Sequence, residues 1–337
     1  MRVVRVSSFG GPEVITCTTG PDPELGPGDV LVRVCAAALN RRDVWLREGL
    51  YPGGNLPLVP GSDAAGVIVA AGAEVDPSVL GWEVVINPGL GWGRHEAVQD
   101  AGFSILGSPH PGTFAELVAV PVSAIHTKPA GLSMQEAAAL PLAAVTAFRA
   151  LVTRGQVQVD ERVLVTGAGG GVATYLIQMA RYCGARVFVT TGSPDKLKKA
   201  EALGAEGGVC YTVPGWADQL REMMDGGADL VMDGAGGAVF GRLLEVARPG
   251  GRIVTYGSTL GPASEVALRQ LFWKQLTVLG TTMGSDAEFV QMLRWADAGA
   301  FAPVVDSVWP LERVADAFER LEGAAAFGKV VVEVQPA

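Results

Sequence analysis

Cysteine and histidine are scarce in this chain, which has four cysteines and three histidines in 337 residues. Cys17, Cys35, Cys183 and Cys210 lie far apart and include no C-x-x-C pair. This spacing argues against a cysteine zinc site and favours buried, reduced thiols over disulfides. No Ser-His-Asp or Cys-His arrangement can be assigned around the histidines, so the sequence gives no sign of nucleophilic catalysis.

Charge is also sparse. Charged residues make up 18% of the chain, which has a formal net charge of −9 and no run of like charges. This pattern argues against nucleic acid or an anionic membrane as a partner and favours small molecules. No apolar run is long and unbroken enough to span a bilayer, and the first residues do not resemble a signal peptide. We therefore expect a cytoplasmic protein.

Glycine and apolar residues are abundant instead, with 45 glycines and 49% hydrophobic residues. Residues 1–125 consist of short β-rich segments separated by turns, which suggests a compact β-rich domain. From about residue 133 a helical segment, "SMQEAAALPLAAVTAFRAL", begins at Ser133 with Glu136 completing a capping box. Uniformly apolar strands then alternate with amphipathic helices, which predicts an α/β fold with a parallel sheet covered on both faces.

A glycine cluster gives the clearest chemical signal. In "VLVTGAGGGVATYLIQMA", residues 163–180, a buried strand leads into glycines and continues as a helix. Gly167, Gly170 and Ala173 give a G-x-x-G-x-x-A spacing, with Gly171 and Val172 between the last two. Small residues there allow backbone N–H groups to approach a pyrophosphate, so we predict a dinucleotide site.

The end of the next strand, "RVFVTTGSPDKLKKA", suggests which dinucleotide binds. An NAD site normally has an acidic residue at the strand end, and none is present here. Lys196 lies one turn into a helix capped by Ser193 and is placed to meet a 2′-phosphate. Alternatively Lys196 belongs to a solvated helix face, as we expect for Lys198 and Lys199; for Lys196 we favour phosphate binding and hence NADPH.

Several segments taken in order carry a family resemblance. The β-rich half, "PLAAVTAF", "VTGAGGGVAT", "GSPDKLKKAEALGA", "RPGGRIVTYGS" and "FGKVVVEV" resemble the medium-chain dehydrogenase/reductase superfamily over essentially the whole chain. Within it, the chain is most similar to the zinc-free, NADPH-dependent quinone oxidoreductase branch. The resemblance implies a GroES-like catalytic domain from residues 1–142 and 285–337, a Rossmann domain from residues 143–284 and an active site in the cleft. It also implies a homodimer formed through the Rossmann edge strand.

The stretch "VPGSDAAG" bears on the metal. Zinc-containing relatives place a cysteine and then a Gly-His-Glu segment around the catalytic ion. Here Leu39 and Asn40 stand in the cysteine region and Ser62 stands where the histidine falls. Zinc requires three protein ligands, and Asp63 alone does not supply them. We therefore expect no metal.

The resemblance also implies roles for individual residues. Asn40, Asp43 and Tyr51 match the catalytic pattern in "NRRD" and "GLYP". Tyr51 is the best candidate for a general acid, with solvent as the alternative. Whether Arg41 or Arg42 faces an anionic substrate, or both lie in a solvated turn, stays open.

The expected reaction is hydride transfer from NADPH to a quinone or an α,β-unsaturated carbonyl. Two alternatives are an alcohol dehydrogenase that has lost its metal sites and a cofactor-binding scaffold without turnover. The residues expected to bind the cofactor are Asn40, Thr146, Gly167, Gly170, Gly171, Val172, Ala173, Thr191, Gly192, Ser193, Lys196, Tyr211, Tyr256, Gly257, Gly328 and Lys329.

Overall fold

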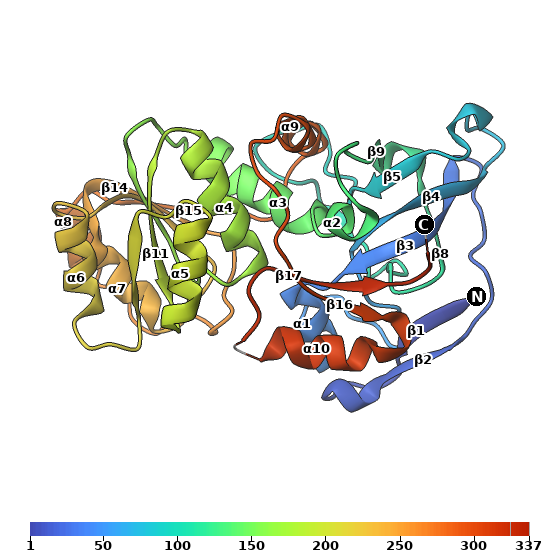
Figure 1. The fold of residues 1–337 in the computed structure, drawn as a ribbon, viewed down its shortest axis with the longest axis horizontal. Coiled ribbons are helices and arrows are strands. Elements are labelled where there is room, and N and C mark those ends of the chain that lie inside the picture. The colour runs from blue at the N-terminus through green and yellow to red at the C-terminus, as the bar shows by residue number, and fades with distance from the viewer. Residues whose placement is uncertain (324, 337) are drawn as a thin grey trace. The chain divides into compact units, whose positions relative to one another are not determined.

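The computed structural model describes residues 1–323 and 325–336, and the chain divides into two compact units (Figure 1). The first unit comprises Met1–Ala143, Ser285–Asp297 and Pro303–Ala337, and the second comprises Ala144–Gly284 and Ala298–Ala302. Within the described residues, none of the helices has both the length and the apolar character that crossing a bilayer requires.

The first unit is built on a seven-stranded sheet in the order β16-β17-β3-β4-β5-β9, with β8 also paired to β3. Its strands are β1 (Arg2–Val6), β2 (Ile15–Thr19), β3 (Asp29–Ala38), β4 (Asp63–Ala71), β5 (Glu83–Ile86), β6 (Gly89–Leu90), β7 (Ser104–Ile105), β8 (Leu117–Pro121), β9 (Ile125–Thr127), β16 (Val305–Pro310) and β17 (Lys329–Glu333). Its helices include α1 (Arg41–Glu48), α2 (Met134–Ala138), α9 (Asp286–Asp297) and α10 (Val314–Glu322).

The last strand joins the β-rich half of the chain. β17 pairs antiparallel with β3, with Val331 opposite Ala38, and parallel with β16. The alternation of buried and half-buried residues along the first part of β3 gives way to complete burial from Cys35 onward, where helices and β17 cover the strand. Thus β3 and β17 bring the start of α1 next to a strand from the far end of the sequence.

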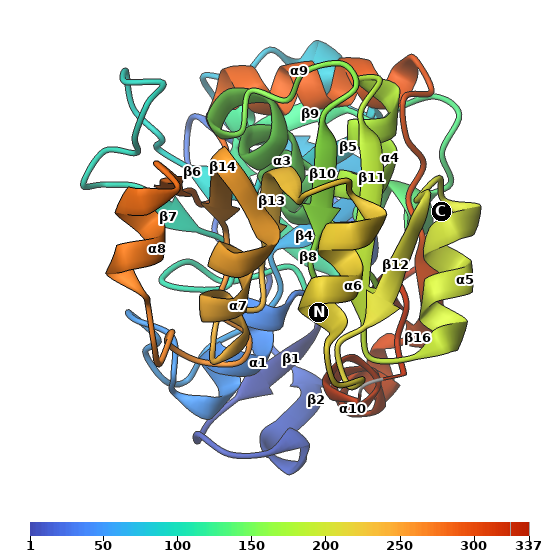
Figure 2. The same ribbon diagram turned by 90° about the vertical axis from the view of Figure 1, so that its left-hand side faces the viewer.

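The second unit is a six-stranded parallel sheet in the order β12-β11-β10-β13-β14-β15. Figure 1 shows α4 and α5 on one face and α6 and α7 on the other, and Figure 2 shows β12 and β14 on opposite sides of β10 and β13. This confirms the predicted doubly covered parallel sheet. The elements are β10 (Arg162–Val165), α4 (Gly171–Tyr182), β11 (Arg186–Thr191), α5 (Pro194–Ala202), β12 (Gly207–Cys210), α6 (Trp216–Met223), β13 (Ala228–Asp233), α7 (Val239–Val246), β14 (Ala247–Thr255), α8 (Leu268–Trp273) and β15 (Thr277–Gly280).

The helical segment predicted from Ser133 begins as expected but is not continuous. The Ser133 hydroxyl accepts a hydrogen bond from the Glu136 N–H at 3.2 Å, and the Glu136 carboxylate accepts from the Ser133 N–H at 2.9 Å. The helix α2 ends at Ala138, and α3 (Pro141–Phe148) starts anew and continues into a π-helical turn. The break falls at Pro141 because proline has no N–H and is favoured only in the first turn of a helix.

Candidate active site

Asp63, at the start of β4, lies at the centre of a fully buried polar cluster. One carboxylate oxygen accepts hydrogen bonds from the Lys329 Nζ and the Asn40 Nδ2, each at 2.9 Å. The other oxygen accepts from the Leu142 N–H at 2.8 Å. Asp63 and Lys329 therefore form a buried ion pair in which the carboxylate has no bare oxygen.

Lys329, the first residue of β17, uses its ammonium group entirely within this cluster. Besides Asp63, Nζ donates to the Leu39 carbonyl at 2.8 Å and to the Asn40 Oδ1 at 2.6 Å. Lysine has three ammonium hydrogens, and these three bonds account for all of them. We expected Lys329 to bind the cofactor; a direct contact through Nζ would require one of these bonds to break. The sequence signal for an ion pair was the position of a lysine within the apolar segment "FGKVVVEV".

Gly328, the other residue predicted there, has a backbone reason to be glycine. Its φ is +102°, and a Cβ at this position would lie 2.3 Å from the Val304 carbonyl oxygen. Any side chain would push β17 away from the chain segment beside it. Gly328 therefore sets the position from which Lys329 reaches Asp63.

Asp43 is also wholly buried, and both of its oxygens meet backbone N–H groups. It accepts from the Asn40 N–H at 2.8 Å, at the start of α1, and from the Gly61 N–H at 3.3 Å. Burial raises the pKa of Asp43 to about 6, and the nearby Arg42 guanidinium opposes this rise. Asp43 thus joins the start of α1 to the segment before β4.

Arg42 lies beside Ser62 in the same region. Its Nη1 donates to the Ser62 hydroxyl and to the Leu106 carbonyl, both at 2.7 Å. The Tyr51 ring covers the guanidinium, with its centroid 4.9 Å from Cζ, and Tyr51 stacks in turn on Trp45. The question left open by the sequence is therefore answered in part, because Arg42 does not lie in a solvated turn.

The donor set around Asp63 and Ser62 does not fit a zinc ion. The Ser62 hydroxyl is bonded to a guanidinium and to a carbonyl, and the Asp63 carboxylate is bonded to an ammonium and to neutral N–H groups. In the part of the chain that the structure describes, no group of three or more His, Cys, Asp or Glu residues is placed to hold a metal. The Arg42 guanidinium lies beside Ser62, and the Lys329 ammonium lies beside Asp63.

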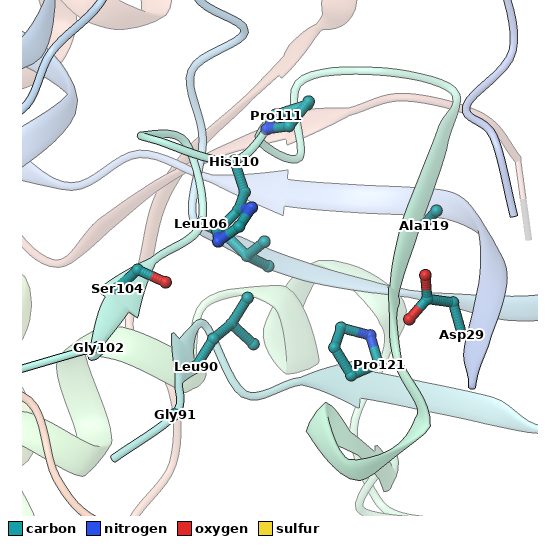
Figure 3. A pocket seen from close by; sticks show the side chains of 10 residues that line it. All are labelled: Asp29, Leu90, Gly91, Gly102, Ser104, Leu106, His110, Pro111, Ala119 and Pro121. Atoms are coloured by element: carbon teal, nitrogen blue, oxygen red, sulfur yellow. The ribbon is translucent and has the colours of Figure 1, made fainter. Parts of the chain in front are cut away.

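A separate cavity of about 370 Å³ opens in the first unit (Figure 3). Figure 3 shows Asp29 at the opposite end from Ser104 and His110, so its polar side chains do not converge. The cavity offers no cluster of groups for chemistry. Its lining residues are Asp29, Leu90, Gly91, Gly102, Ser104, Leu106, His110, Pro111, Ala119 and Pro121.

In the second unit, the predicted glycine turn connects β10 to α4. Gly167 has φ +66°, and a Cβ there would meet no atom within 4 Å, so the space above the turn is open. Gly170 caps α4 without any side-chain hydrogen bond, and Gly171, Val172 and Ala173 follow in the first turn. The first N–H groups of a helix have no partner within the helix. This open turn fits the pyrophosphate of a dinucleotide.

Asp233 supports this turn from the end of β13, a role that sequence reasoning missed. The carboxylate accepts from the Thr166 hydroxyl at 2.8 Å and from the N–H groups of Ala235 and Gly236, both at 3.1 Å. It therefore joins the end of β10 to the turn after β13. An acidic residue directly after the apolar run "LVM" of the strand "ADLVMD" was the available signal.

The residues expected at the 2′-phosphate lie at the ends of β11 and β12. Thr191 is buried at the end of β11, and the Ser193 hydroxyl accepts from the Lys196 N–H at 3.3 Å, capping α5 as predicted. A Cβ on Gly192 would lie 2.8 Å from the Tyr211 hydroxyl oxygen. The Tyr211 hydroxyl thus lies directly against Gly192, and the predicted set forms a compact group.

The remaining predicted residues fall on α3 and at the end of β14. Thr146 is buried on α3. Tyr256 directly follows β14, and its N–H donates to the Asp233 carbonyl at 2.9 Å. A Cβ on Gly257 would lie 3.1 Å from the Gly234 carbonyl oxygen, so the chain after β14 passes close to the turn after β13.

Models of known protein families match segments of both units. A family model described as "Alcohol dehydrogenase GroES-like domain" matches residues 26–130, and one described as "Zinc-binding dehydrogenase" matches residues 171–298. The first match confirms the predicted GroES-like domain.

Individual proteins are similar along nearly the whole chain. The "Zinc-type alcohol dehydrogenase-like protein YogA" of Leptosphaeria maculans is 35% identical, over 93% of this chain and 92% of that protein. Human "Quinone oxidoreductase" is 29% identical, over 98% of this chain and 97% of its own. A crystal structure of an "NAD-dependent alcohol dehydrogenase" superposes with a TM-score of 0.95 at 42% identity, covering 99% of this chain and 100% of its own.

Proposed function

The chain belongs to the medium-chain dehydrogenase/reductase superfamily of nicotinamide-dependent oxidoreductases, and we propose that it transfers a hydride from NADPH to a quinone or an α,β-unsaturated carbonyl without a catalytic metal. The observation that carries this proposal is the buried cluster around Asp63 and Ser62. Lys329 and Arg42 supply positive charge beside these two side chains, where a metal ion would repel both. Quinones and enones accept a hydride without a metal to activate an alcohol.

The cofactor would be held by the second unit. The open turn at Gly167 and the uncapped start of α4 are suited to the pyrophosphate. The absence of an acidic side chain at the end of β11 and the grouping of Gly192, Lys196 and Tyr211 support a 2′-phosphate. The bound nicotinamide supplies the hydride.

Residues of the first unit would act on the acceptor. We propose that Asn40, held by Asp63 and Lys329, orients the reacting groups with its remaining amide hydrogen. Tyr51 is the proposed proton donor, with solvent as the alternative. Thr146 is proposed to contact the nicotinamide ribose or amide.

We also propose a homodimer formed through β15. This strand lies at the edge of the six-stranded sheet, and Val278 on it is exposed. The neighbouring α8 exposes Phe272 and Trp273, the latter to 77%. An exposed edge strand beside large apolar side chains favours pairing with a second copy of the chain.

The alternative is an alcohol dehydrogenase that uses NAD. The names of the fungal relative and of the similar crystal structure favour it. The two activities separate cleanly, because alcohol oxidation by zinc relatives requires an added metal and quinone reduction by the proposed site does not.

The test begins with titrations of NADPH and NADH, followed by turnover of 9,10-phenanthrenequinone and a simple enone in the presence of a chelator. We expect preference for NADPH and full activity with chelator. Lys196→Met should weaken NADPH binding about tenfold and leave NADH unchanged, whereas the exposed Lys198→Met serves as the matched control. Equal binding of NADH would refute the 2′-phosphate assignment, and activity that appears only with zinc and an alcohol would support the alternative.

A further inference from the structure

Arg42 is a buried cation with unused hydrogen-bond donors. It is 6% exposed, and its Nε is buried without a hydrogen-bond partner among residues 1–323 and 325–336. No carboxylate within those ranges forms a salt bridge with it. Leaving a buried charged donor unsatisfied is costly, so such a group is a candidate for binding a ligand.

The orientation of the guanidinium is fixed. The two hydrogens of Nη1 are taken by the Ser62 hydroxyl and the Leu106 carbonyl, and the Tyr51 ring lies over the group. The opposite edge, formed by Nε–H and one Nη2–H, presents two parallel donors. This edge has the geometry that binds an oxygen atom carrying negative charge.

Neighbouring basic side chains are occupied differently. The Lys329 ammonium makes three hydrogen bonds inside the Asp63 cluster. Arg47 forms a salt bridge with Glu322, and Arg41 donates to the Leu321 carbonyl. Arg42 therefore differs from these three in that its Nε–H, on the edge opposite Nη1, is buried without a hydrogen-bond partner in the described part of the chain.

The proposed reaction creates an oxyanion that needs such a donor. When the hydride adds to the β-carbon of an enone, the C=C π pair forms the new Cα=C bond and the carbonyl π pair moves onto oxygen. The hydride would come from the bound nicotinamide cofactor, and the acceptor would become an enolate. A proton from Tyr51 or from solvent then adds to the α-carbon and regenerates the carbonyl. In a quinone, a hydride delivered to one carbonyl oxygen forms an O–H bond there, the ring becomes aromatic, and the π pair of the other carbonyl moves onto its oxygen, which becomes a phenolate.

We propose that the free edge of Arg42 binds the acceptor's carbonyl oxygen and stabilises the enolate or phenolate formed by hydride transfer. This inference rests on the proposed function. Arg42 would be a catalytic residue, and Ser62 a positioning residue that holds Nη1 so that the other edge stays available. A fixed donor aimed at developing charge lowers the barrier without reorganisation during the reaction.

The first test uses 4-nitrophenol, whose ionised form is yellow, as an oxyanion probe. Full-length protein, alone and with NADP⁺, is titrated with the probe across its pH range. Wild type should bind the phenolate about tenfold or more tightly than the phenol, which lowers the pKa of the bound probe. Arg42→Gln should abolish this preference, and Arg42→Lys should keep part of it. Arg41→Gln removes the adjacent charge and should retain the preference.

The second test is kinetic. Arg42→Gln should lower kcat for an enone by about 10²-fold with a smaller change in KM, because the interaction strengthens in the transition state. Arg42→Lys covers the case in which the neutral variant does not fold. Its kcat should lie between those of wild type and Arg42→Gln.

The outcomes separate the two proposals. If wild type shows no phenolate preference, or if Arg42→Gln and Arg42→Lys keep both that preference and kcat within about twofold, the role of Arg42 is refuted. If wild type reduces no quinone or enone but binds the phenolate through Arg42, the proposed function fails and the oxyanion site stands.

Discussion

Replacing Lys329 by methionine tests the buried ion pair with Asp63. The substitution keeps the length and the apolar stem of the side chain but removes the ammonium from a position that is 2% exposed. Breaking a buried pair by deleting one partner costs about 3–5 kcal/mol, because the other charge stays buried. Asp63 would keep N–H donors from Asn40 and Leu142, so we expect the lower end of this range, about 3 kcal/mol.

A double-mutant cycle separates the pair from other effects. Asp63→Asn alone leaves the Lys329 ammonium with the Leu39 carbonyl and Asn40, and it should also be destabilising. The double variant contains neither charge, so its loss should be smaller than the sum of the single losses by about 2 kcal/mol. Such a coupling would show that the two charges stabilise each other in the folded protein.

Scanning calorimetry measures the effect. For a unit of this size a loss of 1 kcal/mol lowers Tm by about 2–4 °C, so Lys329→Met should lower the transition of the first unit by about 6–12 °C. The exposed Lys198→Met should leave it unchanged. A Tm for Lys329→Met within about 2 °C of wild type would refute the reasoning, since the ammonium would then contribute nothing at pH 7.

Three further predictions concern other features. The pKa of Asp43, about 6 when folded against an ordinary 3.8, means that its charge penalty is absent below about pH 4 and complete above about pH 6. The unfolding free energy of wild type minus that of Asp43→Asn should therefore fall by about 3 kcal/mol over this rise in pH in urea titrations, and a flat difference would contradict it. Gly61→Ala should cost about 2 kcal/mol or more in the same assay, because its Cβ would lie 2.7 Å from the Thr113 hydroxyl at φ +99°, whereas Gly53→Ala, at φ +80° with open space, should cost less. Val278→Lys on β15 should convert the proposed dimer to monomers in sedimentation velocity, and Val308→Lys on the edge strand β16 should not; an unchanged mass for the first would exclude the β15 contact.

Patterns of local sequence predicted the second unit well. Strand and helix periods differ, so the alternation of apolar strands and amphipathic helices predicted the parallel sheet, and the glycine spacing located the turn at Gly167. The proline that divides α2 from α3 is visible in the sequence, but we predicted one helical segment across it.

The polar cluster of the first unit was not predictable in the same way. Asp63 and Lys329 are separated by 266 positions, and Arg42 reaches the Leu106 carbonyl 64 positions away. The local hydrophobic period of a sequence does not indicate such contacts, because they depend on the register of β3 against β4 and β17. The resemblance predicted that Ser62 replaces a metal ligand, but not that a guanidinium would bind it.

The return of β17 to β3 also affects how the chain is made on the ribosome. All strands of the second unit come from one continuous stretch, so this unit has its complete sheet available during synthesis. Until β17 has been translated, Asp63 lacks its ion-pair partner Lys329, and β3 lacks its pairing partner along Ala36, Ala37 and Ala38. In the nascent protein, the incomplete sheet of the first unit therefore exposes an unpaired strand edge, and such edges promote aggregation.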